Sequence, residues 1–276
     1  MNWVTEYKIP VGDWSKVIFD WMKAHLSGFF DGVAYVLDNL INGIEWLLQS
    51  PPPLVMIAIF VALAWVLQRN WKICVGVALG FLFILNQGYW KETTESLTLI
   101  LASCVVCMGI GVPIGIAAAH RPRLYQAMSP ILDLMQTLPT FVYLIPAIVF
   151  FGTGLVPGLI ATVIFVLPAP IRLTHLGVAS TPTALLEAAT AFGATPRQRL
   201  WKVELPWAWP QIMAGLNQTI MLSLSMVVIA SMVGAKGLGN PVMRALANVD
   251  AAKGFESGFV IVVVAIALDR MLRVTK

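Results

Sequence analysis

The stretch LTLILASCVVCMGIGVPIGIAAA, residues 97–119, decides the fold class of this chain. It contains no Asp, Glu, Lys, Arg or His from one end to the other. A helix needs about 20 apolar residues to cross the roughly 30 Å of hydrocarbon in a bilayer. The stretch therefore predicts a transmembrane helix.

The composition of the whole chain agrees with this prediction. Hydrophobic residues make up 58% of the 276 residues and charged residues only 12%, and the mean hydropathy is +0.81. A soluble domain has about 25% charged residues. The chain has too few charges for a water-facing surface, so membrane lipid must cover much of it. The net charge of +4 fits basic cytoplasmic loops, and no nucleic-acid partner is expected.

Other apolar stretches extend the pattern to an all-α integral membrane protein with about seven transmembrane helices, the first two short. The stretch 134–171 is long enough for two spans, with Gly152-Thr153-Gly154 as the break. The remaining predicted spans are residues 53–68, 73–88, 205–235 and 257–268.

Residues 13–48 precede these spans and read as one amphipathic helix. Asp31, Asp38 and Glu45 recur every seven residues and fall on one face, opposite many apolar residues. Acidic and basic side chains make a crossing costly, so we expect this helix to lie in the membrane interface. The placement of Lys and Arg favours an outside amino terminus and a cytoplasmic carboxyl terminus. The first residues lack the pattern of a cleaved signal peptide.

Several residues inside the spans predict packing rather than chemistry. Gly111 and Gly115 form a small-xxx-small pair that lets another helix approach closely. Pro113 and Pro139 are expected to kink or break their helices. Cys104 and Cys107 have no second Cys or His pair near them, so we expect small packed residues and no metal site. No catalytic residue is predicted.

The polar segment 180–206 carries the functional information. Local rules make it two short helices that stand off the membrane. Thr181 is expected to cap the first helix, and Gly193 suits a left-handed stop. Thr195 is expected to cap the second in a capping box with Gln198, and Pro206 to end it. Such a hairpin is suited to dock in a groove of a partner.

The same segment resembles the EAA loop of ABC importer permeases. The residues that match are Glu187-Ala188-Ala189, Gly193, Val203 and Leu205-Pro206. The family usually has Ile at the position of Val203. Met232 to Gly239 is similar to the glycine-rich segment that follows the next span in these permeases. Leu138-Pro139-Thr140 and Leu167 to Arg172 resemble the subfamily that imports glycine betaine, choline and proline.

The resemblance implies the type I ABC importer transmembrane fold. Residues 93–276 would form its core, with coupling loop 180–206, after an amphipathic segment 1–50 and two peripheral helices in 51–92. The implied function is a permease for a quaternary amine osmolyte in the bacterial inner membrane. Choline is favoured over glycine betaine.

The resemblance also implies partners. Two permease copies would pair as a homodimer, two ATP-binding subunits would sit below them, and a periplasmic binding protein would deliver substrate. The coupling residues would be Glu187, Ala188, Ala189, Gly193, Leu205 and Pro206. ATP and Mg²⁺ would sit on the partner ATPase, because this chain has no Gly-x-x-x-x-Gly-Lys-Ser/Thr loop and is expected to bind no cofactor.

A quaternary ammonium group is attracted to aromatic faces by cation–π interaction. Candidate residues for the substrate pathway are therefore Phe141, Tyr143, Phe150, Phe151 and Phe165.

Three other functions remain open at this point. The chain could be an ABC permease for another solute, such as proline, another amino acid or a metal. An ion-coupled secondary transporter would usually keep ionisable residues at membrane depth, and the later spans have almost none. A membrane enzyme would need a polar cluster, whereas the three His residues are widely separated.

Overall fold

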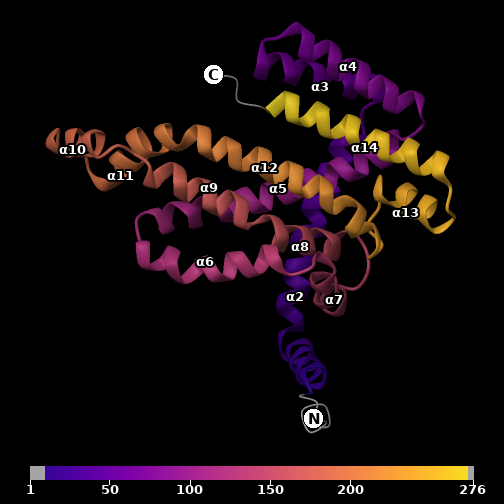
Figure 1. The fold of residues 1–276 in the computed structure, drawn as a ribbon, viewed down its shortest axis with the longest axis horizontal. Coiled ribbons are helices and arrows are strands. Elements are labelled where there is room, and N and C mark those ends of the chain that lie inside the picture. Colours follow the sequence, from indigo (N-terminus) through magenta and orange to yellow (C-terminus); the bar gives the residue numbers. More distant parts are fainter. Residues whose placement is uncertain (1–9, 273–276) are drawn as a thin grey trace, which may run out of the picture.

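The computed structural model describes residues 10–272, and within this range the chain is helical with no strand. This confirms the all-α prediction. Figure 1 shows the arrangement of the helices. Their bounds are α2 (Val11–Gln49), α3 (Pro53–Gln68), α4 (Trp71–Asn86), α5 (Trp90–Ala119), α6 (Pro122–Thr137), α7 (Thr140–Phe151), α8 (Leu155–Val166), α9 (Pro168–Ala179), α10 (Thr183–Ala191), α11 (Pro196–Arg199), the π-helical turn η1 (Leu200–Glu204), α12 (Leu205–Ser231), α13 (Gly239–Ala247) and α14 (Ala251–Leu272).

Four helical stretches in the described range are long and apolar enough to cross a bilayer. They are Trp90–Ala119, Leu155–Ala179, Pro196–Ser231 and Ala251–Leu272. The count rises to six if each of two bent helix pairs is one span. The sequence predicted about seven spans, so the structure supports fewer.

The difference comes from short and broken helices. α4 has 16 residues, and a helix of that length reaches only about 24 Å. The predicted span that starts at Leu134 is instead the end of α6 followed by the short α7, with a bend of 95°. Pro139 lies at this bend, as predicted, because the residue before a proline avoids the helical conformation.

Helix α2 confirms the long helix predicted over residues 13–48. Its backbone departs from helical geometry at Leu26, where φ is −118° and ψ is 16°. Figure 1 shows that α2 runs across the direction of α5 and α12 instead of along it. Phe30 and Ile41 on α2 are buried. This direction suits a helix in the plane of the interface, and its position in a membrane stays a prediction.

The core is built on the close approach of α5 to α9, which also packs against α12. A Cβ atom at Gly115 would lie 2.7 Å from the carbonyl oxygen of Ile171 and 2.7 Å from Cβ of Thr174. A Cβ atom at Gly111 would lie 2.9 Å from Cγ of Pro170. The predicted close approach is therefore confirmed at both glycines.

The glycine-rich segment after α12 is hydrogen-bonded to two neighbouring parts of the helix bundle. Leu238 donates its backbone N–H to Oγ of the buried Ser96 on α5 over 2.8 Å. Gly154, between α7 and α8, donates its N–H to the carbonyl oxygen of Val233 over 2.8 Å. These two bonds hold the loop against α5 and against the turn before α8.

The cysteines pack as expected. Cys104 and Cys107 are both buried in α5. Within residues 10–272, no group of three or more His, Cys, Asp and Glu side chains could hold a metal ion.

A matched pair of substitutions on α5 tests the helix contact. We expect Gly115→Ala to destabilise the protein by about 1–3 kcal/mol, because the new methyl group meets the backbone of α9. Gly109→Ala is the control, since a Cβ atom there has no atom within 4 Å. Thermal unfolding in detergent measures both variants, and equal stability of the two would contradict this account.

Candidate coupling site

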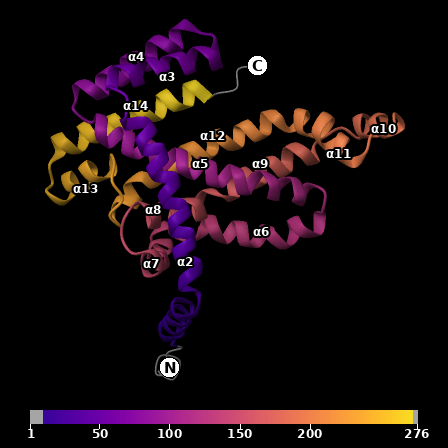
Figure 2. The same cartoon turned by 180° about the vertical axis from the view of Figure 1, so that it is seen from behind.

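The hairpin formed by α10 and α11 projects from one end of the molecule. Figures 1 and 2 show it beyond the ends of α9 and α12 in both views. Neither α10 nor α11 contains a buried residue. The structure thus confirms a helical hairpin that stands off the apolar bundle.

The turn between the two helices has the predicted geometry. Gly193 has a φ of +74°, in the left-handed region that favours glycine. Its N–H donates to the carbonyl oxygen of Thr190 over 2.9 Å, and the N–H of Ala194 donates to that of Ala189 over 3.0 Å. These bonds satisfy the last carbonyl groups of α10.

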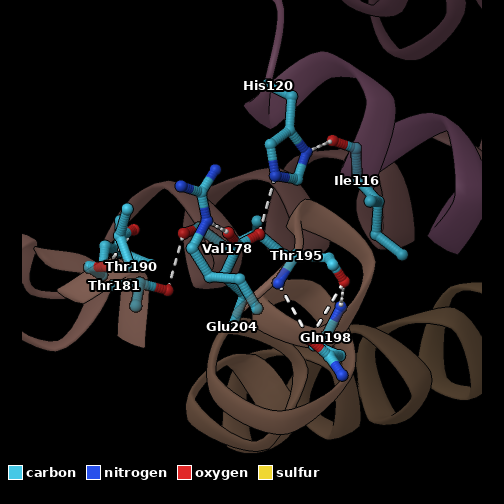
Figure 3. A network of polar contacts seen from close by, with 10 residues as sticks. Ile116, His120, Val178, Thr181, Thr190, Thr195, Gln198 and Glu204 are labelled. Carbon is cyan, nitrogen blue, oxygen red and sulfur yellow. Dashed lines mark hydrogen bonds and ion pairs between the residues drawn. The ribbon is translucent and has the colours of Figure 1, made fainter. Parts of the chain in front are cut away.

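The start of α11 is also as predicted. The N–H of Gln198 donates to Oγ1 of Thr195 over 3.3 Å, and the N–H of Thr195 donates to Oε1 of Gln198 over 2.9 Å. Figure 3 shows this reciprocal pair, which is a capping box. It fixes the direction in which the chain enters α11 after the turn.

Two local predictions are wrong. Thr181 does not cap α10, because its hydroxyl donates to the carbonyl oxygen of Val178 over 2.9 Å and Pro182 takes the cap position. Pro206 does not end a helix, because α11, η1 and α12 continue as one helical stretch from Pro196 to Ser231. Pro206 instead lies in the first turn of α12, where a missing N–H is tolerated, directly after the π turn.

The structure gathers four of the six predicted coupling residues in the hairpin. Glu187, Ala188 and Gly193 are exposed, and Ala189 is half-buried. Leu205 and Pro206 lie apart from them, at the base of the hairpin where α12 begins. Their role in coupling stays a prediction.

The sequence analysis did not predict a buried carboxylate at the base of the hairpin. Glu204 is 3% exposed. Arg199 donates its Nε–H to Oε1 of Glu204 over 3.0 Å, and Nε2 of His120 lies 2.7 Å from Oε2. Figure 3 shows His120 at the end of α5 reaching Glu204. The sequence offered one signal for this site, which is a single acid between the apolar residues Val203 and Leu205.

The five aromatic residues predicted for a substrate pathway fall into different environments. Phe141 is 53% exposed. Tyr143 is buried, and its hydroxyl donates to the carbonyl oxygen of Met135 over 2.7 Å, at the end of α6. Phe165 packs near Tyr143. Phe150 stacks on Phe30 of α2 with ring centroids 4.4 Å apart, and Phe151 meets the same ring edge-on at 5.5 Å. A pathway role for these residues is untested.

An apolar groove of about 1080 Å³ lies between α5 and α12, beside η1. Trp201 and Trp209 line it, together with Leu205 and Pro206. None of the five predicted aromatic residues lines this groove.

Two ionisable residues near span ends have structural partners. Asp133 of α6 forms an ion pair with Arg172 of α9. His175 stacks on Tyr125 with ring centroids 3.7 Å apart. These contacts tie α6 to α9.

Comparison with known families matches residues 111–274, more than half of the chain, to the family described as "Binding-protein-dependent transport system inner membrane component". The glycine betaine transport system permease protein of Bacillus subtilis (strain 168) is 47% identical, over 96% of this chain and 93% of its own length. A glycine betaine/proline betaine permease of Escherichia coli (strain K12) is 44% identical, over 95% of this chain and 74% of its own length.

More distant proteins match a smaller part of the chain. A choline transport system permease protein of Bacillus subtilis (strain 168) is 28% identical, over 67% of this chain and 85% of its own length. Among solved structures, a chain of the inward-facing MetNI methionine ABC transporter is similar with a TM-score of 0.59 and 25% identity. The similarity covers 70% of this chain and 96% of that chain.

The ring contacts generate a prediction about two of the aromatic residues. We expect Phe150→Ala to destabilise the protein by about 3 kcal/mol, because it removes packing against α2. Phe255→Ala should leave stability nearly unchanged, since that side chain on α14 is 80% exposed. Thermal unfolding of both variants in detergent checks this, and a Phe150→Ala protein of full stability would contradict it.

Proposed function

This chain belongs to the family of binding-protein-dependent transport system inner membrane components, as the permease of an ABC importer, and we propose that its substrate is glycine betaine. The observation that carries the substrate is the identity of 44–47% to glycine betaine permeases over nearly the whole chain. Membership of this family sets aside the ion-coupled transporter and the membrane enzyme.

The choice between choline and glycine betaine is thereby revised. Motif resemblance favoured choline, whereas the choline permease reaches only 28% identity over 67% of this chain. A trimethylammonium group is common to both molecules, so cation–π attraction does not separate them. Identity along the whole chain favours glycine betaine.

An ABC importer permease works with an ATP-binding subunit and a substrate-binding protein. In the proposed assembly, two copies of this chain pair and each receives one ATPase subunit. Exposed apolar side chains on α6 and α7 support a second copy as the cover of that face, namely Ile131, Leu134, Phe141 and Ile145. ATP and Mg²⁺ are held by the ATPase, and this chain contributes no catalytic residue.

The hairpin is the proposed contact with the ATPase. Glu187, Ala188, Ala189 and Gly193 enter a cleft of that subunit, with Leu205 and Pro206 at the base. α11 continues through η1 into α12 without a break, so a displacement of the hairpin is carried into a span. In this proposal, ATP binding closes the ATPase pair and opens the substrate pathway of the permease to the outside, and hydrolysis reverses the change.

The proposed orientation puts the hairpin and the carboxyl terminus in the cytoplasm of a bacterial cell, with the amino terminus outside. Figure 1 supports this, because the carboxyl-terminal end of α14 points toward the side on which α10 and α11 lie. The bias of Lys and Arg favours the same sides.

Reconstitution tests the substrate. The permease, its ATPase and its binding protein are placed in proteoliposomes, and uptake of radiolabelled glycine betaine is followed with and without ATP. We expect ATP-dependent uptake that excess glycine betaine blocks more strongly than excess choline or proline. Stronger block by choline or proline would refute the proposed substrate, and uptake driven by an ion gradient without ATP would refute the energy source.

Substitution of Gly193 tests the hairpin. A side chain there has open space, so the cost of Gly193→Val is backbone strain of about 1–2 kcal/mol at a positive φ. We expect the variant to insert normally, hydrolyse ATP and lose most glycine betaine uptake per ATP. Gly193→Asn is the matched control, because Asn tolerates the left-handed conformation and should keep most of the coupling. Normal uptake by Gly193→Val at normal membrane levels would refute the coupling role.

A further inference from the structure

We infer that Glu204 and His120 form a joint that makes the inner end of α5 follow the coupling hairpin. This inference rests on the proposed coupling function of the hairpin and names positioning residues for it. Neither residue is part of the family motif identified in the sequence. Their partners and burial carry the argument.

The chain connects the hairpin directly to two membrane spans, which end in α9 and begin with α12, but it does not connect the hairpin directly to α5. On one side, α11 runs through η1 into α12. On the other side, α10 follows α9 after a short connection at Ser180–Pro182. α5 ends at Ala119, far from the hairpin in the sequence, so a noncovalent contact must connect the two.

Glu204 supplies that contact with both of its carboxylate oxygens. Oε1 accepts from Nε of Arg199, which belongs to α11 of the hairpin. Oε2 lies 2.7 Å from Nε2 of His120, the residue that caps the end of α5. The other ring nitrogen of His120 lies 2.9 Å from the carbonyl oxygen of Ile116. One carboxylate therefore connects hairpin, π turn and α5.

The hydrogen bonds that the buried Glu204 carboxylate accepts are stronger than hydrogen bonds between neutral groups. The Glu204 side chain is only 4% exposed, so water competes little for the carboxylate. Both ring nitrogens of His120 lie within hydrogen-bond distance of an oxygen atom, and Arg199 adds a cationic donor to the same carboxylate. Hydrogen bonds between charged groups are shorter and roughly twice as strong as neutral ones.

The position of Glu204 in the chain explains how the joint can transmit a displacement of the hairpin. Glu204 is the last residue of the π turn, between the hairpin and α12. α5 packs on α9 at Gly111 and Gly115, so the joint at His120 acts on the last turn of α5, beyond that contact. Through this joint, the inner ends of α5, α9 and α12 are displaced together when the ATPase moves the hairpin.

The first test measures transport per ATP in the reconstituted complex. His120→Ala removes the link to α5 and leaves the Arg199–Glu204 pair in place. We expect glycine betaine uptake per ATP to fall about tenfold, the effect of one charge-assisted hydrogen bond, while ATP hydrolysis continues. Glu204→Gln should retain more coupling than Glu204→Ala, because an amide can still accept from Arg199 and donate to a neutral imidazole.

Thr162→Val is the matched control, because Thr162 is a buried polar residue on α8, outside the coupling loop, and its hydroxyl donates to the carbonyl oxygen of Gly158 on the same helix. It should keep the wild-type ratio. The joint is refuted if His120→Ala keeps the wild-type ratio of uptake to hydrolysis, or if Thr162→Val loses as much coupling as His120→Ala.

A second measurement follows the motion without using transport. Hydrogen–deuterium exchange is compared between the resting complex and the complex trapped with ATP and vanadate. In the wild type, both residues 113–121 and residues 200–212 should change their exchange on trapping. In His120→Ala, residues 200–212 should still respond, and residues 113–121 should respond less than in the wild type.

An unchanged response of residues 113–121 in His120→Ala would overturn the joint. This readout does not depend on the identity of the substrate. A wild-type complex that takes up no glycine betaine would refute the proposed substrate alone, and the exchange experiment would still decide whether α5 follows the hairpin.

Discussion

The close approach of α5 to α9 is the constraint on which the rest of the structure depends. Lipid is as apolar as the side chains that face it, so hydrophobicity alone does not hold helices together in a membrane. Association depends instead on close packing, and small residues permit it. Gly111 and Gly115 bring the backbone of α5 against Pro170, Ile171 and Thr174 of α9. This contact sets where the hairpin after α9 begins.

A second feature determines what the hairpin can transmit. A flexible loop between hairpin and span would absorb a displacement, whereas a continuous helix carries it. Pro206 would ordinarily interrupt such a helix. Here the π turn immediately before it shifts the hydrogen-bond register, so that the proline falls in the first turn of α12. The helical stretch from Pro196 to Ser231 is therefore unbroken.

The sequence predicted features that local chemistry determines and missed those that depend on distant residues. The turn at Gly193 and the capping box of Thr195 and Gln198 follow from neighbouring residues, and both are confirmed. The span count and the environments of the aromatic residues depend on how helices bend and pack. Phe150 looked available for a ligand, but its ring stacks on Phe30 of α2, far away in the sequence. The His120–Glu204 contact was missed for the same reason.

The burial of Glu204 is costly, which bears on its purpose. Removing a carboxylate from water costs several kcal/mol, and pairing it with a cation recovers roughly that amount, so a buried ion pair contributes little net stability. Apolar side chains would serve stability as well at the edge of a membrane-spanning bundle. A paired carboxylate adds direction, because Arg199 and His120 must approach along the lone pairs of its two oxygens. A joint between the hairpin and α5 requires contacts of fixed direction. Apolar side chains could slide past one another, whereas the hydrogen bonds of Glu204 hold the two elements in one orientation.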